Sequence, residues 1–150
     1  MPDKTDLAIV LPAYRPPIDR LSEYVEALDT QLGPGRIHVP FDGVQDGDPQ
    51  LRRLEQAGAT VSPPPDRQGK GAALSGAFDR LATSFDRLLF LDAGESASVE
   101  SAAHLAEQVG GSSPTLAIGY RQPQQQAERQ NRTGYRRVFS SAYRQLAHAS

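Results

Sequence analysis

Short apolar runs alternate with helical patterns along most of this 150-residue chain. A continuous run such as residues 7–11 is typical of a strand that is buried on both faces of a parallel sheet. Strands that alternate with helices form a parallel sheet with helices packed on it. The sequence therefore predicts one α/β domain with a mostly parallel sheet. The expected strands are residues 7–11, 37–41, 59–61, 87–91 and 115–118, and the expected helices begin after Pro17, at Pro49, at Gly71, near Ser98 and at Thr133.

The helical patterns also predict which helix faces are buried. After Pro17, the helix face is formed by residues that recur at steps of three and four: Ile18, Leu21, Tyr24 with Val25, and Leu28. Residues 71–83 show a similar pattern, with a predicted packing face of Ala72, Leu74, Ala77, Phe78, Leu81 and Ala82. In the strand at 37–41, Pro40 is unfavourable because proline cannot donate to a strand ladder.

The composition excludes several classes of site. The chain has no Cys, which rules out disulfides and Cys-ligated zinc or iron–sulfur centres. Its three His, at 38, 104 and 148, do not have the spacing of a histidine metal site. No apolar run approaches the roughly 20 residues of a membrane span, and the N-terminus is polar. We therefore expect a cytoplasmic protein without a signal peptide.

The charge is distributed unevenly along the chain. Residues 1–119 carry a net charge of −7, whereas residues 120–150 carry +5, from six Arg against Glu128. Residues 122–132 form a Gln-rich predicted loop, and 133–150 a basic amphipathic helix of the same domain. This helix either packs on the sheet, pairs with a second copy in a homodimer, or lies on an anionic membrane surface.

Polar residues follow successive predicted strands. In open α/β sheets, ligands bind at the carboxyl ends of the strands, so these residues are expected to meet at one edge. The segment Gly69-Lys70-Gly71 precedes a helix, where backbone N–H groups and an ammonium can approach an anion. The pattern predicts a site for a phosphorylated, nucleotide-linked ligand. It consists of Tyr14 after the first strand, Asp42 after the second, Lys70 after the third and Asp92 after the fourth.

Each of these residues also has a purely structural interpretation. Tyr14 either stacks on a nucleobase or covers the core. Asp42 either accepts hydrogen bonds from a base or ribose, or forms a turn with Gly43. Lys70 either pairs with a diphosphate or belongs to an ordinary surface turn, and it is not part of a P-loop because no Ser or Thr follows it. Asp92 either ligates a hard divalent cation or ends the strand as a turn former.

The same segments resemble a known set of motifs. Leu11-Pro12-Ala13-Tyr14-Arg15 matches a strand followed by P-x-Y-N, and residues 40–48 follow V-D-D-G-S-x-D-G-T. Residues 67–77 follow N-x-G-K-G-A-A-L-x-x-G with Gly76 one position early. Leu91-Asp92-Ala93-Gly94 follows a strand ending in D-A-D-G, and Gly119-Tyr120-Arg121 matches G-S-R. Over residues 7–121 the chain therefore resembles the nucleotide-sugar-binding half of the family 2 inverting glycosyltransferases, and most of all the dolichyl- and polyprenyl-phosphate sugar transferases.

The resemblance implies a GT-A, Rossmann-like fold in which residues 1–121 bind a UDP- or GDP-sugar. It also implies an enzyme that transfers the sugar with inversion to a polyprenyl phosphate or glycan. With the basic amphipathic helix at 133–150, we expect a peripheral place at the inner face of the membrane as one option, and no nucleic-acid partner. By the same resemblance, Pro12 and Tyr14 line the base pocket and Asp42 binds the base. Lys70, with Gly69 and Gly71, lies at the diphosphate, Asp92 binds Mg²⁺ or Mn²⁺, and Arg121 faces the acceptor or the phosphates.

The sequence also departs from this pattern. Phe41 replaces the first Asp of the D-D-G pair, and Gly94 replaces the second Asp of D-x-D, which leaves Glu95 as a substitute metal ligand. The chain stops where the acceptor-binding half would continue, so no general base is evident. A phosphate acceptor needs none, because its second pKa is about 6. The alternative is a weak or inactive module that binds nucleotide or membrane; a nucleotidyltransferase is disfavoured because its glycine-rich signature is absent.

Overall fold

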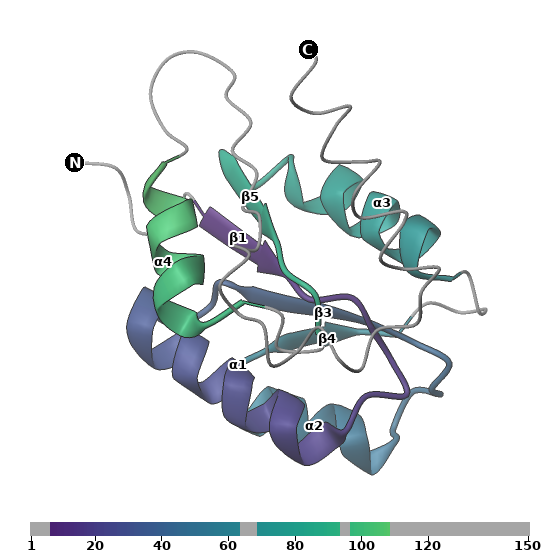
Figure 1. The fold of residues 1–150 in the computed structure, drawn as a ribbon. Helices are drawn as coiled ribbons and strands as arrows, with labels where there is room; N and C mark the ends of the chain where they lie inside the picture. Colours follow the sequence, from purple (N-terminus) through teal and green to yellow (C-terminus); the bar gives the residue numbers. More distant parts are fainter. Residues whose placement is uncertain (1–6, 64–68, 94–96, 109–150) are drawn as a thin grey trace, which may run out of the picture. The chain divides into compact units, whose positions relative to one another are not determined.

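The computed structural model describes residues 7–63, 69–93 and 97–108 (Figure 1). The predictions for Gly94, Glu95, Arg121, the strand at 115–118 and the segments 122–132 and 133–150 concern residues outside this part. The described elements are β1 (Leu7–Val10), β2 (Ala13–Tyr14), α1 (Ile18–Leu32), β3 (Ile37–Asp42), α2 (Pro49–Gln56), β4 (Thr60–Ser62), α3 (Lys70–Leu81), β5 (Arg87–Phe90) and α4 (Val99–Glu107).

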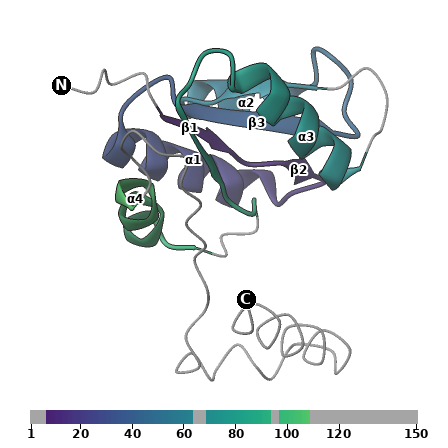
Figure 2. The same cartoon turned by 90° about the horizontal axis from the view of Figure 1, so that it is seen from above.

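Every described pair of strands is parallel. β1 lies between β3 and β5 (Figure 1, Figure 2), and β4 pairs with β3. The chain thus builds outward from β1 through β3 to β4, and then returns through α3 to β5 on the other side of β1. Such a reversal next to the first strand is the switch point of doubly wound sheets. The predicted α/β fold, with a mostly parallel, Rossmann-like sheet flanked by helices, is confirmed.

β1 is buried on both faces, which explains its continuous apolar sequence. Leu7 and Ile9 belong to the larger core cluster, which also contains the buried faces of α1, α2 and α4. Ala8 and Val10 point to the other face and pack in a second cluster with residues of α3. Helices therefore cover both faces of the sheet.

The predicted face of α1 is confirmed, whereas that of α3 is partly wrong. In α1, Leu21, Val25 and Leu28 are buried. In α3 the buried residues are Ala73, Ala77 and Leu81, at steps of four, and Ala72 and Ala82 are exposed. The helix begins at Lys70 and ends at Leu81, so Ala82 already lies past its last residue. The many small residues of this segment left the orientation of the helix poorly defined by sequence.

Strand β2 was not predicted from the sequence. It is separated from β1 by a proline at each of two facing positions. β2 resumes, in the same register, the pairing that β1 makes with β3: Val10 lies opposite His38, and Ala13 lies opposite Phe41. This register places Pro12 opposite Pro40. Neither proline can donate a backbone hydrogen bond, so the ladder is interrupted there. Pro40 is therefore accommodated within β3 at the point where β1 ends.

Two helix starts follow from their caps. Asp48 caps α2 by accepting a hydrogen bond of 2.8 Å from the N–H of Gln50, and Pro49 is the first helical residue. Ser98 caps α4 by accepting a hydrogen bond of 3.1 Å from the N–H of Ser101. None of the helices in the described ranges has the length and apolar character needed to cross a bilayer.

His38 on β3 gives the fold a predicted pH dependence. Its ring lies edge-on to Phe85, with centroids 5.4 Å apart, and its Nε2 is buried without a hydrogen-bond partner. Burial, and secondly the charge of Arg80, lower the pKa of His38 from its ordinary value of 6.5. Below pH 6.5 the unfolded chain therefore takes up a proton that the folded chain does not, and stability falls as the pH is lowered until the folded-state pKa is passed.

We expect His38→Phe to remove this contribution. The free energy of unfolding, measured by urea denaturation between pH 7.5 and pH 5, should decline less steeply in the variant than in the wild type. The other titrating groups are common to both proteins, so their contributions to the pH dependence of the free energy of unfolding cancel in the comparison. Parallel declines in the two proteins would show that His38 does not titrate differently on folding.

Candidate functional site

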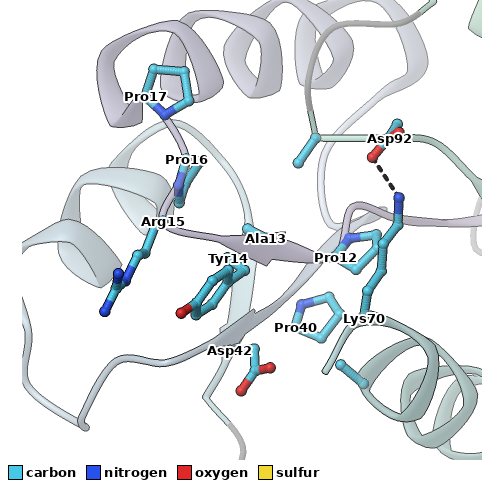
Figure 3. A pocket seen from close by; sticks show the side chains of 12 residues that line it. Pro12, Ala13, Tyr14, Arg15, Pro16, Pro17, Pro40, Asp42, Lys70 and Asp92 are labelled. Carbon is cyan, nitrogen blue, oxygen red and sulfur yellow. Dashed lines mark hydrogen bonds and ion pairs between the residues drawn. The ribbon is translucent and has the colours of Figure 1, made fainter. Parts of the chain in front are cut away.

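A cavity of about 280 Å³ lies at the carboxyl ends of β1 and β3 (Figure 3). The loop after β1, the end of β3, the start of α3 and the residues after β5 all contribute to it. The polar residues expected at this edge are therefore brought together in one cavity. Its lining residues are Pro12, Ala13, Tyr14, Arg15, Pro16, Pro17, Pro40, Asp42, Lys70, Ala73, Asp92 and Ala93.

Lys70 and Asp92 form an ion pair at one end of the cavity. The distance from Lys70 Nζ to Asp92 Oδ1 is 2.7 Å, and both side chains are about half exposed. The ammonium also lies 5.4 Å from the centroid of the Phe90 ring. An exposed pair of this kind contributes at most about 1 kcal/mol to stability. A charged ligand can therefore separate the two side chains at little cost to the fold.

The start of α3 adds a second source of positive potential. Lys70 is the first residue of the helix, and Gly69 before it supplies no side-chain cap, which leaves N–H groups of the first turn available to an anion. Gly69 has a φ of +81°, a conformation that favours glycine. Gly71 is different, because its φ is not positive. A Cβ added at either glycine would meet nothing within 4 Å, so only the backbone conformation of Gly69 favours glycine. Neither glycine is among the residues that line the cavity.

Asp42 has a structural role that the sequence did not reveal. Its side chain is almost fully buried, with 3% of its surface exposed, although it reaches the cavity wall. Its Oδ2 accepts a hydrogen bond of 2.8 Å from the backbone N–H of Gly69. Asp42 thereby holds the glycine turn that presents Lys70. The partner lies 27 positions along the chain, so no local pattern could have indicated this contact.

Tyr14 and Arg15 occupy the other end of the cavity. Tyr14 lines the cavity and is 40% exposed. The guanidinium carbon of Arg15 lies 5.3 Å from the centroid of the Tyr14 ring. Gly43 packs closely against the same ring, since an added Cβ would lie 2.8 Å from Tyr14 Cε2. Arg15 was expected as a cation at this edge of the sheet, but no role was predicted for it, because neither its stacking nor its backbone conformation has a sequence signature.

Gly43→Ala should therefore disturb both the fold and the ring. Gly43 has a φ of +83°, and the new methyl group would overlap Tyr14. We expect a loss of about 1–2 kcal/mol in the free energy of unfolding, measured by urea denaturation. Gly76→Ala is the matched control: it lies inside α3 with nothing within 4 Å, and should raise stability by about 0.5–1 kcal/mol. Equal effects of the two substitutions would contradict this account of Gly43.

The described residues offer limited support for a metal ion. Within residues 7–63, 69–93 and 97–108, no group of three or more His, Cys, Asp or Glu side chains could hold one. Asp92 supplies a single carboxylate, which already pairs with Lys70. Mg²⁺ is commonly held by one or two carboxylates together with the phosphates of a substrate. The donors therefore fit a divalent cation only when a diphosphate provides further oxygen ligands.

Phe41 explains one departure from the motif pattern. Its side chain is fully buried and belongs to the larger core cluster. The position that carries an Asp in the resembled motif thus has a packing role here, and it cannot supply a second carboxylate to the cavity.

Comparison of the chain with protein-family models, with curated proteins and with solved structures found no match. At one end, Lys70 and Asp92 lie beside a helix N-terminus. At the other end, Arg15 lies over an exposed tyrosine ring.

Proposed function

We propose that this protein binds a UDP- or GDP-linked sugar in the cavity and transfers the sugar, with inversion, to a polyprenyl phosphate or glycan acceptor. In this proposal the domain is a GT-A-like fold related to the family 2 glycosyltransferases. The observation that carries the proposal is the convergence of Tyr14, Lys70 and Asp92, from separate segments, in one cavity at the switch point of the sheet.

The two ends of the cavity suit the two ends of a nucleoside diphosphate. The Lys70 ammonium and the first turn of α3 would bind the diphosphate and stabilise the negative charge that develops on it as the leaving group. The base would lie toward Tyr14, over the proline-rich wall that includes Pro12 and Pro40. An acceptor phosphate is already anionic near neutral pH, so its attack needs positioning more than it needs a general base.

Asp92 is the residue that would hold Mg²⁺ or Mn²⁺ when the diphosphate is bound. Such an ion neutralises charge on the phosphates. Asp92 must first separate from Lys70, and Lys70 would then turn to the phosphates. We therefore expect the cation alone to bind weakly and the diphosphate to strengthen its binding.

Isothermal titration calorimetry with UDP and GDP tests this proposal. We expect at least one nucleotide to bind the wild type, more tightly with Mn²⁺ than with a chelator. Asp92→Asn should remove the effect of Mn²⁺, because it removes the carboxylate charge. Absence of binding by both nucleotides would overturn the proposal.

The Lys70–Asp92 ion pair favours a second candidate, a nucleotide-binding module that needs no metal. In that case Lys70 is the cation for the diphosphate, and Asp92 orients it. Binding would then be equal with Mn²⁺ and with chelator. Incubation with a nucleotide sugar and a polyprenyl phosphate separates the candidates further, since only a transferase releases the nucleoside diphosphate in step with glycosylated lipid.

A further inference from the structure

Arg15 has an unusual backbone conformation at the wall of the cavity. Among the residues that the structure describes, it is the only one other than glycine with a positive φ, of 46°. It also precedes Pro16, and residues before proline normally adopt extended backbone. Conformations of this kind are unfavourable for residues with a side chain and tend to occur where a ligand is bound. We therefore infer that the Arg15 side chain has a functional role at the cavity.

The Arg15 side chain is placed to contact a ligand. It lines the cavity and is exposed, and its guanidinium lies over the Tyr14 ring. Within the described ranges it forms no ion pair, in contrast to Lys70, which pairs with Asp92. A guanidinium that stacks on an aromatic ring keeps its in-plane N–H groups available. Arg15 can therefore offer two parallel donors to a planar ligand.

The position of Arg15 indicates which part of a nucleotide it would meet. Figure 3 shows Arg15 and Tyr14 toward one side of the cavity and Lys70 with Asp92 toward the other. If the diphosphate lies at Lys70 and the start of α3, then the group that reaches Arg15 is the base.

We propose that Arg15 recognises the edge of the base and makes the cavity selective for guanine; this inference rests on the proposed binding of a nucleoside diphosphate. Guanine carries two adjacent acceptors, O6 and N7, on the edge remote from the ribose, and paired arginine donors fit them. Uracil and adenine place an N–H donor beside the acceptor on the corresponding edge. Cytosine has an adjacent acceptor pair only next to the ribose. Guanine is therefore the common base that satisfies both donors of Arg15.

Calorimetric titration of the wild type and of Arg15→Lys with GDP, UDP and ADP tests this inference. The wild type should bind GDP about 5- to 100-fold more tightly than UDP or ADP. Arg15→Lys keeps the charge and loses the paired donors, so GDP affinity should fall by a similar factor while UDP affinity changes little. Retained UDP binding also shows that the variant is folded.

The other outcomes separate this inference from the proposed function. If GDP and UDP bind the wild type equally, selection of guanine is wrong, although the cavity still binds nucleoside diphosphates. If Arg15→Lys weakens all three nucleotides by the same factor, Arg15 contacts a phosphate and the inference is also wrong. If none of the three binds the wild type, the proposed function fails, and this inference fails with it.

Discussion

Replacement of Phe41 by Ala should lower the free energy of unfolding by about 3–5 kcal/mol. Phe41 is fully buried, with 0% of its surface exposed to solvent. It is among the largest fully buried side chains of the described residues. Truncation to Ala removes the buried apolar surface of the ring. It also leaves a cavity, because Phe41 packs in the core cluster together with buried residues of α1, α2 and α4. Urea denaturation, monitored by circular dichroism, measures the effect.

Phe90 provides the matched control, because it is the same residue type on a neighbouring part of the sheet but is 40% exposed. Phe90→Ala should cost less than about 1.5 kcal/mol, since Phe90 buries less apolar surface than Phe41 does. Similar losses in both variants would contradict the burial that the structure assigns to Phe41. Phe41→Asp, which introduces the residue found at this position of the resembled motif, should prevent folding because it buries an unpaired charge.

Lys70→Gln should weaken the binding of the preferred nucleoside diphosphate by about 10- to 100-fold, the loss expected for a hydrogen bond to a charged group. The substitution also leaves Asp92 without its cation beside the phosphates, which adds repulsion. The thermal unfolding midpoint should barely change, because the ion pair is exposed. Calorimetry and thermal unfolding together measure the two effects.

Arg80→Gln is the control for Lys70→Gln. Arg80 is an exposed cation on the same helix, but it donates a hydrogen bond to Ser62 and does not line the cavity. This variant should bind the nucleotide as the wild type does. If the two variants lose affinity equally, the effect is general electrostatic attraction and Lys70 has no special role.

Much of the fold could be predicted because its elements have local causes. The uninterrupted apolar sequence of β1 reflects burial on both faces, and Asp48-Pro49 supplies a cap and a first residue for α2. The strand β2 could not be predicted, since it depends on the register that sets Pro12 opposite Pro40. The face of α3 was also mispredicted in part, because alanines lie on several of its sides.

The part of the candidate site that could be predicted is the set of residues placed together by the order and direction of the strands. Parallel strands end at a common edge, so Tyr14 and Asp92 could be expected near one another before any contact was known. The bond from Gly69 to Asp42 joins distant parts of the chain, and it could not be predicted from either segment alone. The positive φ of Arg15 was equally unpredictable, because its sequence favours an extended backbone there.

A crystal structure of the protein with bound nucleoside diphosphate and Mn²⁺ is the most direct test of the central claim, that the cavity between Tyr14 and Lys70 is the nucleotide site. We predict phosphate oxygens within hydrogen-bonding distance of Lys70 Nζ, the base beside Tyr14, and separation of Lys70 from Asp92. A nucleotide bound elsewhere, with the 2.7 Å ion pair between Lys70 and Asp92 intact, would contradict it.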